Sequence, residues 1–441
     1  MNYVDELVGA AGEDSVRIDL AARQRASKDF AWLSPILARD LPDVIADVVV
    51  RPRHREQIPA ILAVAYRHRI PLVPRGRGTG NYGQAVPLHG GIVLDLSDCR
   101  TVLSIDDEFV IAEAGCTFEQ LESELTAVGR EVAVMPSTAT STIGGFLSGG
   151  NQGIGSIEHG SIWDGWVHEL TIVGCQPQPQ PLQVSGEGLR RHLHAFGTTG
   201  VITTVTLRHS AKRDRTALFG SFTTMKQAAH AGQQLMDLPQ LPRAISVDDE
   251  AAYRHYPQHS GMVGAVLLRT ILDVDQVDAA RAIVVAAGGQ VTATDVKAIG
   301  AISRSVYNHT TVMVARGRPG TTAVQIRGNA IIDHEEDVRR VLPEVCIHLD
   351  GNAPAGYGKG FSGLLFSQWI DDATLARGIG ALRELGVRVV SPHTWMVGSH
   401  GGLEHYQAAS AQHDPLGLLN PGKLPASGRP ISAFVTTRAI R

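Results

Sequence analysis

A glycine-rich stretch early in the chain limits the folds open to it more than any other feature. Residues 74–83 read PRGRGTGNYG and follow the apolar run IPLV at 70–73. They lack the GxxxxGK[ST] pattern of a Walker loop. A Rossmann loop would open directly into a helix, but here Pro87 and the pair Gly90 and Gly91 follow. What remains is a run of unobstructed backbone N–H groups, which suits an anion, or alternatively a plain tight turn.

Two further glycine-rich blocks favour a ligand over three unrelated turns. In residues 136–153, PSTATSTIGGFLSGGNQG, a run with five hydroxyl side chains at 137–142 is followed by two glycine pairs. Residues 196–207, FGTTGVITTVTL, repeat the theme just before a predicted strand. Hydroxyl and N–H groups suit a polar ligand with many acceptors, and glycine lets the backbone approach it closely. We therefore expect the three loops to hold one extended ligand.

The hydrophobic periodicity around these loops predicts an α+β domain. A strand at 48–50, a helix at 57–69 and a strand at 70–74 form a βαβ start. Strands are expected at 90–99, 109–115, 168–174 and 201–209, with QPQPQP at 176–181 as an exposed hairpin tip. Residues 117–129 predict a helix that begins with a capping box, Thr117 and Gln120, and buries Phe118, Leu121, Leu125 and Val128 on one face.

The composition changes at the charged residues 212–215, where we place a domain boundary. Beyond it, strand patterns at 218–222 and 265–272 alternate with helix patterns at 223–236 and 275–289. These predict a second α+β domain, a sheet with helices on one face. The expected division is 1–212, 213–397 and a C-terminal segment, 398–441, that returns to the first domain.

Composition excludes several classes of function. The chain has 441 residues, a formal net charge of -4 and no basic run, which argues against a nucleic-acid partner. No segment is long and apolar enough to span a bilayer, and the acidic N-terminus does not resemble a signal peptide. The four cysteines form no CxxC pair, as is typical of reduced thiols in a cytoplasmic protein. The scattered histidines do not suggest a metal site.

The order of the motifs resembles one family. A βαβ start, PRGRGTGNYG, GGIVLDLS, AEAG, PSTATSTIGG, FGTTGVIT and a terminal DPLGLLNPGK occur together. This order resembles FAD-linked oxidoreductases of the vanillyl-alcohol-oxidase type, with the PCMH-type flavin domain also found in glycolate-oxidase and D-lactate-dehydrogenase flavin subunits. The resemblance covers residues 48–208 and 413–424. It implies a two-part FAD-binding domain and an α+β substrate-binding cap domain.

The resemblance also implies which residues bind FAD. The groups that carry over by position are the pyrophosphate cradle, the flavin and diphosphate wall, and a last group made of the adenine end (200–202) and the tail, which returns to the isoalloxazine side (Asn420 and Lys423). Their members are Arg75, Gly76, Arg77, Gly78, Thr79, Gly80 and Asn81; then Pro136, Ser137, Thr138, Thr142, Ile143, Gly144, Gly145, Gly149, Gly150, His159 and Gly160; and then Gly200, Val201, Ile202, Asn420 and Lys423.

The chain departs from the family at the positions of covalent attachment. Members with a tethered flavin often have a histidine where Thr79 stands and a cysteine near Thr138. The resemblance therefore implies noncovalent FAD, with a tether from a cap histidine left open. The HxGDGN metal motif of one branch is also missing, because residues 347–352, IHLDGN, share only DGN with it.

The cap is expected to supply the catalytic groups. FAD enzymes of this type need a group that accepts the proton of the substrate hydroxyl. In VYNHTT, read as a strand, Tyr307 and His309 point to one face, and His393 lies in SPHTW. Arg327 suits a substrate carboxylate. For each of these side chains an ordinary structural or surface role is the alternative.

These expectations describe an oxidase or dehydrogenase for a small alcohol or hydroxy acid that passes electrons to O₂ or to an electron-transfer acceptor. Two alternatives stay open: a reductase of a UDP-sugar enolpyruvyl ether that uses NADPH, and a flavin-binding subunit without catalysis. A homodimer is compatible with the family.

Overall fold

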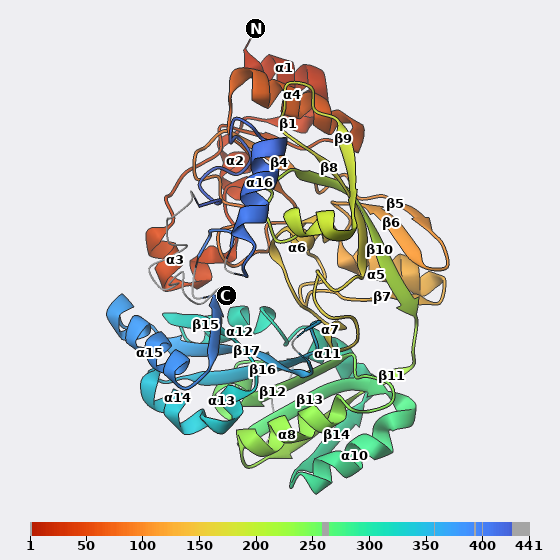
Figure 1. Ribbon diagram of the computed structural model, residues 1–441, viewed down its shortest axis with the longest axis vertical. Coiled ribbons are helices and arrows are strands. Elements are labelled where there is room, and N and C mark those ends of the chain that lie inside the picture. Colours follow the sequence, from red (N-terminus) through yellow and green to blue (C-terminus); the bar gives the residue numbers. More distant parts are fainter. Residues whose placement is uncertain (1, 258–263, 357, 392–393, 399, 426–441) are drawn as a thin grey trace.

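Two lobes stacked along the long axis make up the chain in a computed structural model (Figure 1). The structure describes all residues except 1, 258–263, 357, 392–393, 399 and 426–441. The mixed helices and sheets confirm the predicted α+β class. The first lobe contains residues 2–211 and 403–425, and the second contains residues 215–391.

The first lobe has two sheets. The smaller sheet has the order β1-β2-β4-β3 and consists of β1 (Val16–Arg17), β2 (Val48–Val50), β3 (Leu72–Arg75) and β4 (Ile92–Asp95). The larger has the order β5-β6-β10-β8-β9, with β7 also paired to β10, and consists of β5 (Val102–Ile105), β6 (Phe109–Glu113), β7 (Arg130–Val132), β8 (Val167–Val173), β9 (Pro181–Ser185) and β10 (Val201–Ala211).

The second lobe is built on one antiparallel sheet with the order β14-β11-β13-β12-β16-β17-β15-β18. Its strands are β11 (Arg215–Phe222), β12 (Ala244–Asp249), β13 (Val266–Asp273), β14 (Gln290–Asp295), β15 (Thr321–Arg327), β16 (Cys346–Asn352), β17 (Gly360–Gln368) and β18 (Arg388–Ser391).

The helices surround these sheets. Those of the first lobe are α1 (Tyr3–Ala11), α2 (Leu20–Ala26), α3 (Pro35–Asp40), α4 (Ile58–His68), α5 (Phe118–Ala127), α6 (Ile143–Gly149), α7 (Ser156–His159) and α16 (Leu403–His413). Those of the second lobe are α8 (Met225–Leu235), α9 (Glu250–Tyr253), α10 (Val277–Ala286), α11 (Ile299–Ser303), α12 (His309–Gly317), α13 (Ala330–Asp333), α14 (Glu335–Val341) and α15 (Asp372–Glu384).

The predicted βαβ start is confirmed. Strands β2 and β3 both pair in parallel with β4, and α4 makes the connection between β2 and β3. Its apolar stripe, Ile58, Ile61, Leu62 and Ala65, is fully buried. This unit fixes the end of β3, from which the first glycine loop departs.

The predicted helix after residue 117 is confirmed except at its capping box and its end. The Gln120 side chain donates to Arg100 O and Glu124 Oε1, so only the threonine half of the capping box forms. Thr117 accepts a hydrogen bond from the backbone N–H of Gln120, and Phe118 and Leu121 are buried. The helix ends at Ala127, so Val128 leaves the helical face and is 57% exposed, contrary to the expectation.

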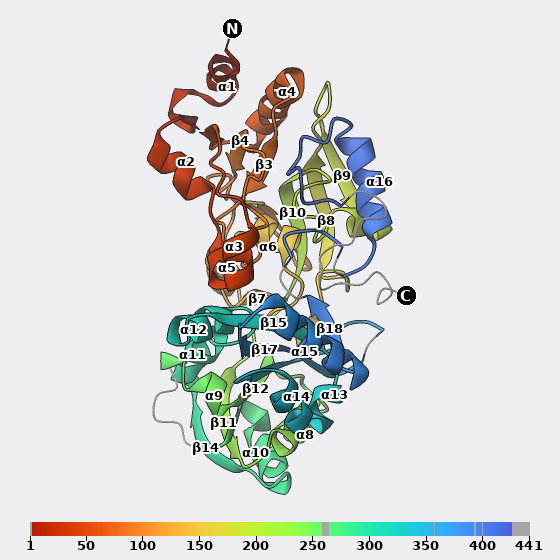
Figure 2. The ribbon, with the colours of Figure 1, turned by 90° about the vertical axis from the view of Figure 1, so that its left-hand side faces the viewer.

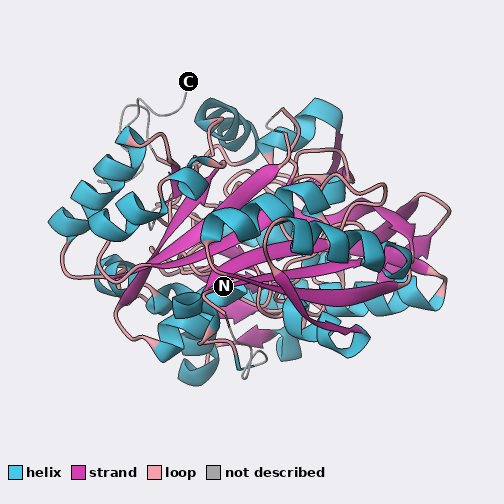
Figure 3. Ribbon diagram, turned by 90° about the horizontal axis from the view of Figure 1, so that it is seen from below, coloured by secondary structure: helices cyan, strands magenta, loops and turns pink. Residues whose placement is uncertain are grey.

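The second lobe corrects the prediction of helices on one face. Helices α8, α10, α13, α14 and α15 pack on one face of the sheet. The view from below shows helices lying across the strands (Figure 3). Helices α9, α11 and α12 pack on the opposite face, over Phe219 and Leu364. The physical reason is visible in β13, where all eight residues are buried, because a central strand covered on both faces does not alternate.

The chain crosses between the lobes and returns. The sheets change at residues 212–214, within the charged stretch where a boundary is predicted; the domain division itself stays a prediction. The tail packs beside β3, with the N–H of Leu72 donating to Leu418 O and the N–H of Asn420 donating to Leu72 O, both at 2.8 Å. Figure 2 shows α16 lying against the first lobe. Within the described residues, no helix combines the length and apolar character needed to cross a membrane.

Candidate functional site

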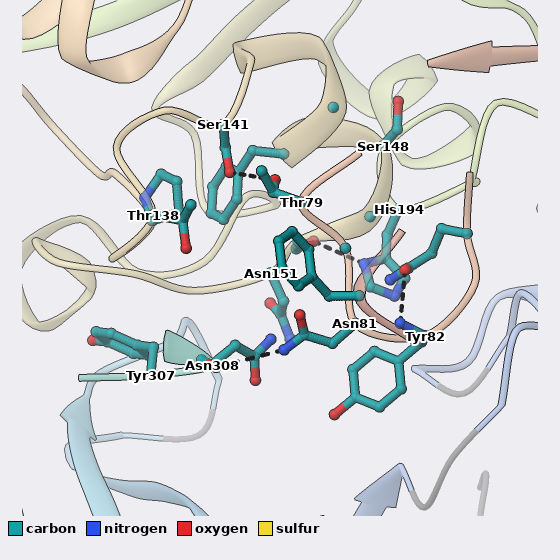
Figure 4. Close-up of a pocket in the computed structure, with 18 of the residues that line it drawn as sticks. Thr79, Asn81, Tyr82, Thr138, Ser141, Ser148, Asn151, His194, Tyr307 and Asn308 are labelled. Atoms are coloured by element: carbon teal, nitrogen blue, oxygen red, sulfur yellow. Dashed lines mark hydrogen bonds between the residues drawn. The ribbon is translucent and has the colours of Figure 1, made fainter. Parts of the chain in front are cut away.

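A cavity of about 430 Å³ lies where the two lobes meet. The first lobe contributes residues 74–82, parts of 136–152, and the segment around 194–202, which are the three glycine-rich loops. The second lobe contributes residues 307–309, Arg327, Asp350 and 362–364. The structure therefore brings together the loops and cap residues that are far apart in sequence (Figure 4).

The first loop is shaped by Arg75, the last residue of β3. Its Nη1 donates to the carbonyl oxygens of Ala26 and Lys28, at 2.9 and 2.7 Å. Gly78 passes over this guanidinium with φ +62°, and a Cβ there would lie 2.1 Å from Arg75 Nη2. Glycine alone suits that conformation and that contact. Arg75 thus braces the loop from within the protein while also lining the cavity.

The second loop is joined to the first by a hydrogen bond between side chains. The hydroxyls of Thr79 and Ser141 are 2.7 Å apart (Figure 4). Thr142 caps α6 by accepting a hydrogen bond from Gly145 N–H, and a Cβ on Gly76 would lie 2.0 Å from Thr142 Oγ1. The backbone at Gly76 therefore lies closer to the Thr142 side chain than any side chain at residue 76 would permit.

The third loop carries His194, a site residue that the sequence analysis missed. Backbone N–H groups of His194 and Phe196 donate to Leu147 O and Ser148 O at 2.8 and 2.9 Å, which joins this loop to α6. The Nδ1 of His194 lies 2.8 Å from Gly150 O. Because a carbonyl only accepts, Nδ1 carries the hydrogen and Nε2 keeps a lone pair. Burial lowers the pKa of His194 to about 4, so the ring is neutral at pH 7.

The ring of His400, from the C-terminal part of the chain, packs against the ring of His194. The ring centroids of His194 and His400 are 4.5 Å apart. Burial lowers the pKa of His400 well below its ordinary value, and the neighbouring His194 and Arg327 lower it further. No local pattern in the sequence relates these two histidines, so only the fold could reveal the pair.

Among the described residues, three buried polar atoms of cavity-lining side chains have no hydrogen-bond partner. They are Asn151 Oδ1, Gln152 Nε2 and Asp350 Oδ1. Buried polar groups in native proteins are almost always paired, so unpaired ones along a cavity wall indicate where a ligand completes the site. Asn151 and Gln152 lie at the end of the second glycine-rich block, residues 136–153, but neither was among the predicted contacts.

Several predicted FAD contacts lie behind the cavity wall instead of on it. Ile143 and Val201 are buried in the hydrophobic cores of the first lobe, because they alternate with the residues that face the cavity. His159 pairs with Ser210 Oγ at 3.2 Å, and Gly160 adjoins it at the end of α7. Direct contact with a ligand in the cavity is not supported for these four residues.

The tail residues brace the loops from behind. Asn420 Nδ2 donates to Gln84 O and Phe196 O, at 2.9 and 2.7 Å. Lys423 Nζ donates to Gly83 O at 2.5 Å and is fully buried, and burial lowers its pKa to about 7. Neither side chain lines the cavity, so the NPGK turn acts on the first loop through its backbone.

The second-lobe wall corrects the expected strand at VYNHTT. His309 is the first residue of α12, and Tyr307 precedes the helix in a left-handed conformation with φ +50°. Both residues nevertheless line the cavity (Figure 4 labels Tyr307). Burial lowers the pKa of His309 and raises that of Tyr307 well above its ordinary value. His309 Nδ1 lies 3.4 Å from Thr138 Oγ1 of the second loop.

The other two predicted catalytic residues have different outcomes. Arg327, at the end of β15, lines the cavity. His393 lies outside the described residues. Two side-chain contacts also join the lobes at the rim: Gln325 Nε2 donates to the Tyr82 hydroxyl at 2.8 Å, and Asn81 Nδ2 donates to Asn308 O at 3.5 Å.

The glycine-loop region matches a known family model. Residues 46–176 match the model described as an FAD binding domain. Residues 46–176 are an FAD-binding domain. The site fits this cofactor, since glycines of all three loops and the hydroxyl residues Ser137, Thr138 and Ser141 line the cavity. Buried polar atoms of Asn151 and Gln152, which have no hydrogen-bond partner among the described residues, lie along the same wall. The predictions of FAD and of a PCMH-type flavin domain are therefore confirmed; noncovalent attachment stays a prediction.

Curated relatives extend the similarity beyond the FAD-binding domain. The chain is 32% identical over 193 residues to a D-lactate dehydrogenase of Archaeoglobus fulgidus, a match that covers 41% of this chain and 43% of that one. It is 26% identical over 440 residues to the glycolate oxidase subunit GlcD of Escherichia coli strain K12, covering 85% of this chain and 83% of the relative. In the first of these relatives, the match thus spans less than half of the protein.

A solved structure shares the whole architecture. An alkyldihydroxyacetonephosphate synthase superposes with a TM-score of 0.73 over 95% of this chain and 85% of the other, at 17% identity. This likeness shows the fold, including the second lobe on the FAD-binding domain.

Proposed function

We propose that the protein is an FAD-dependent oxidoreductase that oxidises the CH–OH group of a small 2-hydroxy acid. One observation carries the proposal: a single cavity joins the three glycine loops to a second-lobe wall that contains Arg327. The names of the relatives, D-lactate dehydrogenase and glycolate oxidase subunit, support this substrate class. A guanidinium is the group best suited to hold a carboxylate with two parallel hydrogen bonds.

The two walls of the cavity have different tasks in this proposal. FAD, when bound, would supply the acceptor for the hydride that leaves the substrate carbon. Residues 76–81, 137–138, 141–142, 144–145 and 149–150, with Gly200 and Ile202, would hold the cofactor through backbone and hydroxyl groups. Arg327 would orient the carboxylate from the opposite wall. His309, on the second-lobe wall, contacts the second loop through Thr138 and would therefore lie beside the cofactor.

Anaerobic mixing tests the proposal. The FAD-loaded protein is mixed with lactate, glycolate and larger 2-hydroxy acids, and the loss of the oxidised flavin absorbance is followed. We expect reduction by at least one of them. Reduction by NADPH alone would favour the enolpyruvyl reductase alternative, and bound flavin that no compound reduces would favour a subunit without catalysis.

Arg327→Lys sharpens this experiment. A lysine keeps the charge but loses the two-pronged geometry, so we expect KM for the hydroxy acid to rise by about tenfold or more while FAD stays bound. Arg377→Lys is the matched control, because Arg377 is exposed on α15 outside the cavity. An unchanged KM in Arg327→Lys would refute the role of Arg327.

The remaining partners are part of the same proposal. We infer a cytoplasmic location from the four free cysteines, all buried, which suit a reducing compartment. Either O₂ or an electron-transfer protein would reoxidise the flavin, and the rate of reoxidation in air distinguishes them. The proposed homodimer is tested by sedimentation of the purified chain.

A further inference from the structure

A buried ionic cluster lies in the second-lobe sheet beside the cavity. Asp248 on β12, Arg269 on β13 and His348 and Asp350 on β16 are 0 to 3% exposed. Asp248 accepts hydrogen bonds from Arg269 Nη2 at 2.5 Å and from the Tyr256 hydroxyl at 2.8 Å. Charges this deeply buried are tolerated only when they are paired and hydrogen-bonded.

His348 links the two carboxylates of the cluster. Its Nδ1 lies 2.7 Å from Asp248 Oδ1, and its Nε2 lies 2.8 Å from Asp350 Oδ2. A neutral imidazole could donate to only one of them, whereas the imidazolium donates to both. Consistent with this geometry, the two aspartates raise the pKa of His348 to about 9 despite its burial. Both ring nitrogens are occupied by donation, which leaves no lone pair for another partner.

Asp350 uses only one of its two oxygens within the protein. Its Oδ2 accepts from His348 Nε2 and from the backbone N–H of Tyr307, at 2.8 and 3.0 Å. Its Oδ1 is buried and has no partner, although Asp350 lines the cavity. The carboxylate is therefore held in a fixed orientation with a free acceptor on the cavity wall. A hydrogen-bond donor on a ligand in the cavity would satisfy that acceptor.

Asp350 and Arg327 stand in one row across the sheet. Asp350 is opposite Ser362 in the pairing of β16 with β17, and Ser362 is opposite Arg327 in the pairing of β17 with β15. All three line the cavity, so they share one face. Two strand spacings, roughly 9–10 Å, separate the ends of the row. An arginine side chain extends over much of that span, so a small molecule can reach both ends.

We propose that Asp350 Oδ1, rather than His309, accepts the hydrogen bond of the substrate hydroxyl, with His348 as the positioning residue that fixes the carboxylate. The assignment rests on the proposed function, since it takes a 2-hydroxy acid as the ligand. The carboxylate of that acid meets Arg327 at one end of the row, and its hydroxyl meets Asp350 at the other. The site should therefore bind a ligand with a hydroxyl on carbon 2, which donates a hydrogen bond, more tightly than one with a carbonyl there, which only accepts.

Asp350→Asn inverts the hydrogen-bonding character of the wall. The two donors on the Oδ2 side, His348 and the N–H of Tyr307, retain the amide oxygen, so the amide NH₂ takes the place of Oδ1. An acceptor becomes a donor with no change in size. Asp237→Asn is the matched control, because Asp237 is exposed and pairs only with Lys359 among the described contacts.

Binding of two dead-end ligands to the FAD-loaded protein provides the readout. 2-Hydroxyisobutyrate presents a hydroxyl but has no hydrogen on carbon 2 and cannot be oxidised there, and pyruvate presents a carbonyl. Calorimetry gives both Kd values for each variant. We expect the unmodified protein and Asp237→Asn to prefer 2-hydroxyisobutyrate. We expect Asp350→Asn to shift the ratio of Kd values toward pyruvate by about ten- to a hundredfold, the effect of one hydrogen bond to a charged group.

The outcomes separate the two proposals. A ratio that Asp350→Asn leaves unchanged overturns the role of Asp350 while the substrate class stands. An unmodified protein that retains FAD but binds neither ligand overturns the substrate class and the assignment together. If Asp350→Asn does not fold, the ratio of Kd values in the unmodified protein still tests the assignment. Tighter binding of pyruvate than of 2-hydroxyisobutyrate would contradict a hydrogen-bond acceptor at this position. His348→Gln, which leaves the carboxylate in place, is expected to keep the preference for 2-hydroxyisobutyrate but to reduce it.

Discussion

A single substitution at Gly76 gives a sharp test of how the FAD site is built. In Gly76→Ala the new Cβ would lie 2.0 Å from Thr142 Oγ1 and 3.0 Å from Thr142 Cβ. Thr142 is 2% exposed and caps α6 through the N–H of Gly145, so it cannot turn aside freely. Either Thr142 leaves its rotamer and loses the cap, or the first loop moves away from the second.

The two costs can be estimated from known effects. Loss of a threonine N-cap costs about 1 kcal/mol, and an off-rotamer side chain about 0.5–1.5 kcal/mol, which together give about 1.5–2.5 kcal/mol of lost stability. A loop that moves instead disturbs the backbone N–H groups that face FAD. We expect the affinity for FAD to fall by at least about tenfold, equivalent to about 1.4 kcal/mol.

The assay combines urea unfolding of the apoprotein with titration of FAD. Gly9→Ala is the control, because no atom lies within 4 Å of a Cβ on this residue of α1. It should keep FAD affinity and gain up to about 1 kcal/mol of stability. The double variant Gly76→Ala with Thr142→Ala tests the cause: if the clash is responsible, the double variant loses less than the sum of the single variants. Additive losses, or unchanged FAD binding in Gly76→Ala, would refute the reasoning.

Two further predictions concern stability. Glu131 and Arg215 form a buried two-pronged ion pair between the lobes, with N–O distances of 2.5 and 2.6 Å. Glu131→Gln should lower the free energy of unfolding by about 3–5 kcal/mol, whereas Glu108→Gln, at an exposed pair with Arg208, should lower it by less than about 1 kcal/mol. Equal losses for the two variants in urea unfolding would contradict this. Lys423 has a folded pKa of about 7 against 10.5 when unfolded, so the unfolded chain binds more protons between these values. The free energy of unfolding should therefore rise from pH 7 to 10.5 by up to about 1.4 kcal/mol per pH unit, and Lys423→Met should lose that rise; a variant with the same pH dependence as the unmodified protein would exclude this assignment.

Local patterns were enough to predict the βαβ unit, helix α5 and several strands of the first lobe, but not α1–α3, α6 or α7. The apolar stripe of α4 and the Thr117 cap of α5 depend on residues a few positions apart, so periodicity finds them. Glycine at residues 76 and 78 signals close backbone contact for the same local reason. The resemblance then identified the ligand of the loops as FAD.

The second-lobe wall could not be predicted in this way. Asp248, Arg269 and Asp350 come from three strands that become neighbours only when the sheet forms. The expected strand at VYNHTT was wrong because six residues with few apolar side chains carry no reliable period, and there α12 begins at His309. The tail residue Lys423 was assigned to the cavity by position, whereas it supports Gly83 from behind.

The central claim is that three glycine loops hold one FAD noncovalently at the meeting of the lobes. An absorption spectrum of the purified protein, taken before and after acid precipitation, tests it most directly. The account predicts the bands of oxidised flavin, released wholly into the supernatant. Colour retained in the pellet would contradict noncovalent binding, and a colourless protein that cannot be reconstituted with FAD would contradict the site itself.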